Sequence, residues 1–449
     1  MVYYYSYLFS TQNIVLAVLF YILLYLLLTS RSKQFQDLND QKRFSRNFNL
    51  KILLVTIYAL YYTFIVGGGD TVAYWEGASC LNNLFWKSPG MFFEQLFNEP
   101  TQEMGWRHFD TATGIPPGWI YREAESWFVS KVFVIINFIS FKSYIVGNLI
   151  MATVMSLASF RLFKMIQTFG LHQDKFIAFA VLFLPSVSFW CAGITKDTIV
   201  LLAVICINVN FLEWILKIPG NNKKRIVIIF IYGFLLFHIR DFMLSVLGVA
   251  FGVVLMARLA NRYRGKPFQF YSLRLLTIVL GFIVFTSQGS KLAESEQMKQ
   301  AEITANDFAQ NKTYDGARYS IGVTNFSPSG LVAGFIPAII AGIYRPFLWE
   351  GLSFSLIFNG LESMYFFYLT WLFLRKDFLK KVNVIRKNEF LAFAFVFSVL
   401  LAFMVGLTSG LLGVLVRFKA PLLSFFLLVL TIDFEVFDQT SSNEVLEEK

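Results

Sequence analysis

The stretch IVLAVLFYILLYLLL, residues 14–28, contains no charged side chain and is followed directly by a basic segment. A transmembrane helix needs about 20 predominantly apolar residues. The apolar runs are continuous rather than alternating, so they predict helices and not the strands of a β-barrel. Such runs fall at about 13–29, 51–66, 127–141, 144–163, 176–190, 197–216, 226–239, 242–257, 273–287, 330–344, 350–374, 390–406 and 411–432. The sequence therefore predicts an all-α, polytopic transmembrane bundle that occupies residues 1–449.

The composition supports this fold class. Hydrophobic residues make up 56% of the chain and charged residues 15%, whereas a soluble domain carries about 25% charged residues. This balance excludes a disordered chain, a disulfide-framed secreted module and a soluble enzyme. Three cysteines without a CxxC motif and three scattered histidines give no metal-site pattern, so we expect no metal and no cofactor. The net charge of +10 is explained by basic cytoplasmic loops, and we expect no nucleic-acid partner.

The basic residues predict the orientation. Five connecting segments hold 24 of the 39 lysines and arginines, and the positive-inside rule places such segments in the cytoplasm; they are 31–51, 161–175, 217–225, 258–274 and 375–387. Thirteen full crossings would put some of these segments outside. We therefore expect about eleven crossings, within a range of ten to thirteen, with 127–141 and 330–344 re-entrant or interfacial. A bundle with one more crossing is the main rival.

In this topology the N-terminus lies outside and the acidic tail, 433–449, lies in the cytoplasm. Two large loops, 67–126 and 288–329, face outward. Tryptophan is enriched at membrane interfaces, and its faces also stack on sugar rings. We interpret the five tryptophans of the first loop mainly as interface anchors; they are Trp75, Trp86, Trp106, Trp119 and Trp127.

Ionisable residues gather at the outer ends of the predicted spans. Such residues are costly inside or beside a bilayer and mark functional sites by default. Simpler interpretations exist, because Arg240 and Asp241 could form a local ion pair, and Asp197 could cap a helix. Their occurrence in several separate segments on one side of the membrane favours a shared site. The residues are Asp70, Lys196, Asp197, Arg240, Asp241, Arg318, Arg345 and Arg417.

Three short motifs resemble a family of membrane proteins. They are GGGDTVAYWEG at 67–77, LPSVSFWCAGITKDTIV at 184–200 and GVLVRFKAP at 413–421. These motifs are similar to stretches of bacterial O-antigen and exopolysaccharide polymerases and of lipid-sugar-dependent glycosyltransferases of the GT-C type. The resemblance is scattered over about a third of the chain. Val414 stands where the family usually has Thr, and Asp241 stands where Pro is expected after Arg240.

The resemblance implies chemistry on undecaprenyl-diphosphate-linked glycans at the outer face of the bacterial inner membrane. A lipid diphosphate needs cations at headgroup depth, and the planar fork of arginine binds phosphate bidentately. Glycosyl transfer also needs a carboxylate to deprotonate the acceptor hydroxyl or stabilise the transition state. Asp70 is the first catalytic candidate, and Asp197 and Asp241 are its rivals. The candidates for substrate binding are Lys196, Arg240, Arg318, Arg345, Arg417, Tyr74 and Trp349.

Two other functions remain open at this point. The chain could be a transporter or flippase of a lipid-linked or anionic solute, or a non-catalytic membrane subunit of an envelope assembly. The expected partners are a lipid-linked glycan substrate, membrane lipids and other proteins of envelope polysaccharide assembly. The enzyme hypothesis predicts that Arg240, Arg345 and Arg417 approach one another around a cavity on the outer face.

Overall fold

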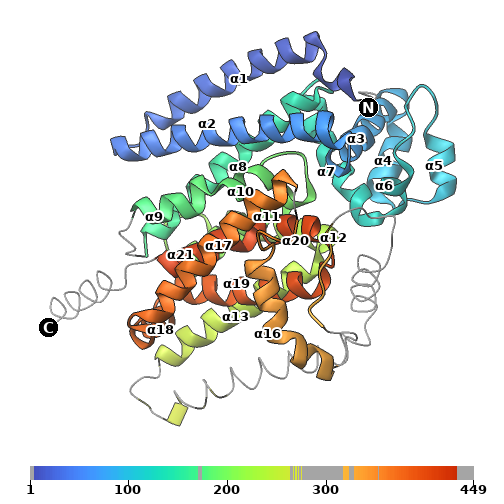
Figure 1. Ribbon diagram of the computed structural model, residues 1–449. Helices are drawn as coiled ribbons and strands as arrows, with labels where there is room; N and C mark the ends of the chain where they lie inside the picture. Colours follow the sequence, from blue (N-terminus) through green and yellow to red (C-terminus); the bar gives the residue numbers. More distant parts are fainter. Residues whose placement is uncertain are drawn as a thin grey trace. The chain divides into compact units, whose positions relative to one another are not determined.

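The computed structural model describes residues 5–169, 174–262, 317–322, 328–351 and 353–431, with a few single positions between 263 and 275 (Figure 1). Every regular element in these residues is helical, and an isolated β-bridge joins Arg318 to Leu411. The all-α prediction is confirmed. Three predicted segments lie outside the described residues, apart from the single position Leu275. They are the run 273–287, the loop 288–329 up to residue 316, and the tail 433–449.

The chain divides into two compact units. Unit 1 comprises Met1–Met165 and Val181–Asp241, and unit 2 comprises Ile166–Ala180 and Phe242–Lys449. The helices of unit 1 are η1 (Ser6–Phe9), α1 (Thr11–Ser32), α2 (Leu38–Leu60), η2 (Tyr61–Val66), α3 (Asp70–Lys87), α4 (Pro89–Phe97), α5 (Gln102–His108), α6 (Gly118–Arg122), α7 (Ala124–Ile139), α8 (Tyr144–Gln167), α10 (Pro185–Trp190), α11 (Lys196–Ile215) and α12 (Asn222–Ile239). Those associated with unit 2 are α9 (Asp174–Ala178), η3 (Phe179–Phe183), α13 (Asp241–Arg262), α16 (Pro328–Tyr344), α17 (Phe354–Arg375), α18 (Phe378–Lys387), α19 (Glu389–Thr408), α20 (Leu412–Phe418) and α21 (Ala420–Thr431).

Five helical stretches in the described part are long and apolar enough to cross a membrane. They are α1, α2 continued by η2, α8, α11 and α19. A sixth candidate consists of α20 and α21, which meet at an angle of 62°. The structure thus has five or six candidate spans, fewer than the predicted eleven. The two runs predicted to be re-entrant or interfacial form the short helices α7 and α16, of 16 and 17 residues.

The segment 67–126, predicted as an outer loop, folds into α3, α4, α5, α6 and the start of α7. Helices α3 and α7 pack side by side and run parallel, because Gly77 lies against Ser130 while Phe85, further along α3, contacts Phe138 near the end of α7. Trp127 is buried where α3 meets α7, and Trp75 is buried against Tyr144 and Gly147 of α8, so their interpretation as interface anchors is wrong. Trp86, Trp106 and Trp119 are exposed.

A turn of three glycines separates η2 from α3. Gly67, Gly68 and Gly69 all have positive φ angles, of 75°, 119° and 81°. Residues with a Cβ rarely adopt this conformation, so the glycine run allows the chain to turn sharply. The turn makes Asp70 the first residue of α3.

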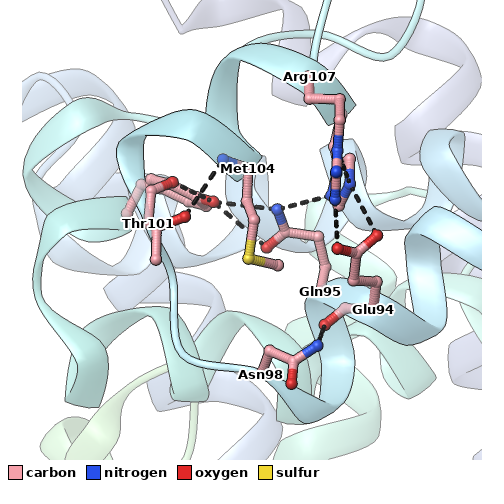
Figure 2. A network of polar contacts seen from close by, with 8 residues as sticks. Glu94, Gln95, Asn98, Thr101, Met104 and Arg107 are labelled. Carbon is pink, nitrogen blue, oxygen red and sulfur yellow. Dashed lines mark hydrogen bonds and ion pairs between the residues drawn. The ribbon is translucent and has the colours of Figure 1, made fainter.

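A polar network holds α4 and α5 together (Figure 2). Glu94 forms an ion pair with Arg107, and its Oε2 lies 3.1 Å from Nε2 of the buried His108. Gln95 Nε2 lies 3.0 Å from His108 Nδ1 and donates to the Tyr121 hydroxyl of α6 over 3.0 Å. This network fixes which face of α4 points inward.

In unit 2, α16 and α19 cross at very short distance. A Cβ on Gly342 would lie 2.1 Å from the Ala402 carbonyl oxygen, and one on Gly406 would lie 1.9 Å from the Ala338 carbonyl oxygen. Small residues that let two backbones approach closely are typical of helix packing in membranes. Glycine at these two positions therefore permits the crossing.

Candidate functional site

Charged side chains from three helices meet in unit 1. Arg240 follows the last turn of α12, and its Nη2 lies 2.7 Å from Asp197 Oδ1 in the first turn of α11. Only 6% and 4% of these two side chains are exposed. Lys196 Nζ lies 3.6 Å from Glu123 Oε2 and 3.8 Å from Glu125 Oε2 at the start of α7. We call these five residues the charged cluster.

Helix ends position the charged cluster. Thr195 is the N-cap of α11, and its hydroxyl accepts a hydrogen bond from the Thr198 amide over 3.0 Å. Capping starts the helix at Lys196, which places Lys196 and Asp197 in the first turn. Asp197 is therefore an ion-pair partner of Arg240 rather than the N-cap.

The electrostatics of the cluster single out one carboxyl group. Desolvation by the surrounding protein raises the pKa of Glu125, and Lys196 lowers it by a smaller amount. The neighbouring carboxylates of Glu123 and Asp241 raise this pKa further. A perturbed carboxyl beside a specific cation is a candidate for proton transfer.

Asp70 lies at the same end of the α3–α7 pair as Glu123 and Glu125, because the two helices run parallel and it is the first residue of α3. Asp241 is the first residue of α13 and follows Arg240 directly. Tyr74 is buried in the packing of α3, which leaves its side chain 3% exposed and makes it a weak candidate for direct substrate contact.

Lys51 is a charged residue that the sequence analysis placed in a cytoplasmic segment. In the structure it is 2% exposed within α2, and its Nζ donates to Ser188 Oγ of α10 over 3.2 Å. Among the described residues, no carboxylate forms an ion pair with it. The apolar run predicted for this span starts at residue 51, whereas α2 begins at Leu38. Lys51 therefore lies several turns inside the helix and not in a loop.

The turn between α10 and α11 is also buried. A Cβ on Gly193 would lie 2.6 Å from Asn148 Oδ1 and 3.2 Å from atoms of Val55 and Tyr58 in α2. The Ile194 amide donates to Asn148 Oδ1 over 3.1 Å. Irregular backbone at membrane depth is tolerated where protein satisfies its polar groups, as Asn148 does here. The turn between α10 and α11 therefore lies within unit 1.

A second group of charged and aromatic side chains lies in unit 2. Arg345 Nε is 3.3 Å from Glu350 Oε1, and the guanidinium carbon lies 4.8 Å from the centre of the Tyr319 ring. Phe347 stacks on Trp349 with ring centres 5.1 Å apart, and Trp349 is 77% exposed. We call Tyr319, Arg345, Phe347, Trp349 and Glu350 the Arg345 corner.

Arg318 and Arg417 also belong to unit 2. Arg318 precedes Tyr319, is exposed and pairs its backbone with Leu411. Arg417 is half-buried in α20. Two residues later, Lys419 is buried, and its Nζ donates to the carbonyl oxygens of Ile343 and Arg345 and to Ser363 Oγ.

The structure thus brings together some of the candidates. Lys196, Asp197 and Arg240 meet in unit 1. The convergence of Arg240 with Arg345 and Arg417 involves both units and stays a prediction. Sequence reasoning did not single out Glu123, Glu125 or Glu350, although the pattern Glu-x-Glu before an apolar run is typical of a first helical turn. Among the described residues, no group of three or more His, Cys, Asp or Glu side chains is placed to hold a metal ion.

Comparison of the chain with protein-family models, curated proteins and solved structures finds no match. The resemblance to polysaccharide polymerases therefore rests on the three short motifs alone. The charged cluster and the Arg345 corner are the two groups of side chains whose chemistry indicates a function.

Proposed function

We propose that this protein acts in envelope polysaccharide synthesis and polymerises or transfers lipid-diphosphate-linked sugars at the outer face of the bacterial inner membrane. The observation that carries the proposal is the charged cluster. It places the Lys196 ammonium within 4 Å of two carboxylates, beside a buried Asp197–Arg240 ion pair. Cations and carboxylates in one place are the groups that transfer from a diphosphate donor requires.

The proposed reaction assigns a role to each type of group. A carboxylate takes the proton of the acceptor hydroxyl, whose oxygen attacks the anomeric carbon of the donor sugar. The bond from that carbon to the diphosphate breaks, and a nearby cation stabilises the leaving diphosphate. The carboxylates that we propose for proton transfer are Asp70, Asp241 and Glu125, while Asp197 holds Arg240 in a buried ion pair.

The Arg345 corner fits the same substrate class. The Arg345 guanidinium lies 5.9 Å from the centre of the Phe347 ring, which stacks on the exposed Trp349, so the corner offers a donor for phosphate and an apolar face for a sugar ring. Trp349 and Arg345 therefore keep their proposed roles in substrate binding.

The experiment is complementation of a deletion strain with single variants. Glu125→Gln and Asp70→Asn each remove one carboxylate charge while keeping the side-chain shape. Glu103→Gln, at an exposed position on α5, is the matched control. Loss of a general base lowers the rate by about 10²–10⁴-fold. We expect mass analysis of surface glycans to show loss of extension for one of the two variants, together with accumulated lipid-linked intermediates. Full glycan length in Glu125→Gln, Asp70→Asn and Asp241→Asn would overturn the enzyme proposal.

The proposal includes the topology of about eleven crossings, with the N-terminus outside and the C-terminus inside. The basic segments support it. Cysteine labelling at positions 88 and 381 from either side of the membrane tests it. We expect the residue replacing Ser88 to react from outside and the one replacing Lys381 to react from inside. Labelling of position 381 from outside would contradict the assignment of α16 as a helix that does not cross.

One observation favours transport as a second candidate function. Lys51 is buried in the middle of a candidate span, and the Cys191–Thr195 turn breaks the helical structure beside it. Broken helices next to buried charges are typical of transporter binding sites. Movement of a fluorescent lipid-diphosphate sugar across proteoliposomes that stops in Lys51→Met would favour this function over transfer chemistry.

A further inference from the structure

Large aromatic side chains are exposed at the end of α3 and along α4. Trp86 and Phe97 are 73% and 79% exposed, and Phe93 is 47% exposed. They belong to one run of touching rings, because Phe85 lies 5.3 Å from Trp86 and 5.2 Å from Phe92, measured between ring centres. Phe92 in turn contacts Phe93, and Phe93 stacks on Phe97.

The same surface continues onto the end of α7. Phe138 packs against Phe85, and Ile139 and Phe141 beyond it are 52% and 73% exposed. The Phe141 ring lies 6.3 Å from the Phe20 ring of α1, the candidate span with only 11% of its apolar window buried. We call the exposed set Trp86, Phe93, Phe97, Ile139 and Phe141 the aromatic surface. It is continuous with α1, whose apolar side chains are largely exposed in the structure.

The chain connections keep this region at the bilayer. The α3–α7 segment begins four residues after η2 ends at Val66, and α8 begins five residues after Ile139. The two attachment points lie together, because Thr71 Oγ1 is 2.9 Å from the Tyr144 hydroxyl. Helices α3 to α7 are therefore tied at both ends to candidate spans.

The charges around the aromatic surface fit lipid headgroups. Exposed Lys87 and Lys142 directly follow Trp86 and Phe141 in sequence; the Lys87 ammonium pairs with Asp110, and Lys142 Nζ donates to Asn83 Oδ1 over 2.6 Å. Aromatic rings beside lysines are typical of the membrane interface, where the ammonium groups reach the phosphate layer and the rings lie below it. An exposed apolar patch marks an interaction site, and lysines next to its aromatic residues favour a membrane as the partner.

The orientation of α4 is fixed. Gln95 and Phe92 point into the buried side, where Gln95 joins the network with His108 and Tyr121 (Figure 2). Phe93 and Phe97 are consequently held on the outer side and cannot turn inward without breaking these hydrogen bonds.

We propose that the aromatic surface is embedded in the headgroup and upper acyl region of the bilayer leaflet at which η2 ends and α8 begins. Its partner is the phospholipid surface. The helices α3 to α7 are then an interfacial platform and not a solvent-exposed loop. This inference is independent of the reaction that the charged cluster performs.

Spin labels on the full-length protein test the proposal in nanodiscs of phosphatidylcholine and phosphatidylglycerol in equal parts. Cys80, Cys191 and Cys206 are first replaced by serine. Phe97→Cys and Ile139→Cys report on the aromatic surface, and Arg122→Cys, at an exposed polar position, is the control. Oxygen concentrates in the bilayer, whereas a water-soluble nickel complex does not.

We expect oxygen to relax the labels at positions 97 and 139 several-fold more strongly than nickel does, with the reverse at position 122. Labels at 97 and 139 that behave like the label at 122 would show a solvent-exposed surface and overturn the proposal. Labels that neither reagent reaches would show that protein covers the surface, which also overturns it.

Discussion

The ion pair between Asp197 and Arg240 allows a sharp test of what the charged cluster does. Asp197→Asn removes the negative charge and with it the ion pair that Asp197 forms with the buried Arg240 guanidinium. Removing one member of a buried ion pair costs about 3–5 kcal/mol. For a unit of this size each kcal/mol lowers the Tm by about 2–4 °C, so we expect a loss of about 6–20 °C.

A second variant separates stability from function. Asp197→Leu combined with Arg240→Met replaces both charges with apolar side chains, and such replacements are often neutral or stabilising by about 1–4 kcal/mol. We expect the double variant to recover the Tm of the unchanged protein. If the cluster binds substrate, glycan extension is lost although the protein is stable. Retained extension would show that the pair is only structural.

The assay uses the protein's own thiols. Cys80 and Cys191 are buried, so a thiol-reactive fluorogenic dye reports unfolding of the detergent-solubilised protein on heating. A Tm of Asp197→Asn within 2 °C of the unchanged protein would refute the reasoning, because loss of one partner of a buried ion pair should lower the free energy of unfolding by more than such a shift allows.

Three further predictions concern other parts of the chain. Gly406→Ala forces a Cβ against the Ala338 carbonyl and should lower stability by about 1–3 kcal/mol in a thermal assay, whereas Gly413→Ala, with open space around it, should not. Burial lowers the pKa of His108 below its usual 6.5, so the folded form resists protonation more than the unfolded chain does. The protection of amides in α4 and α5, measured relative to their intrinsic exchange rates at each pH, should therefore fall as the pH drops below 6.5 towards the folded pKa, and His108→Gln should remove this dependence. Arg345→Lys keeps the charge but loses the planar group over Tyr319, so mass analysis should show shortened glycans while Arg386→Lys, at an exposed position on α18, leaves them unchanged.

The long apolar helices could be predicted from the sequence because hydrophobic run length alone determines them. The predicted run 390–406 corresponds to α19, which spans Glu389–Thr408, and the run 197–216 corresponds to α11, which spans Lys196–Ile215. Their ends coincide with capping residues, Asn388 and Thr195, whose side chains accept hydrogen bonds from the first turns.

Tertiary partners could not be predicted in the same way. Asp197 and Arg240 were each singled out as polar residues in an apolar chain, but the sequence offered Asp241 as the partner of Arg240 and a helix-capping role for Asp197. Trp127 and Trp86 have the same residue type and lie in the same segment, yet one is buried and the other is exposed. Packing of α3 against α7 decides between them, and no local pattern contains that information.

Lys419 gives the bend between α20 and α21 a mechanical consequence. Its ammonium holds two carbonyl oxygens at the end of α16 and a hydroxyl on α17. Hydrogen bonds to a charged group are stronger than neutral ones, and breaking them in an interior leaves the charge without compensation. These hydrogen bonds fix the bend to α16 and α17. A displacement of α21 would therefore also move the chain segment that carries Arg345.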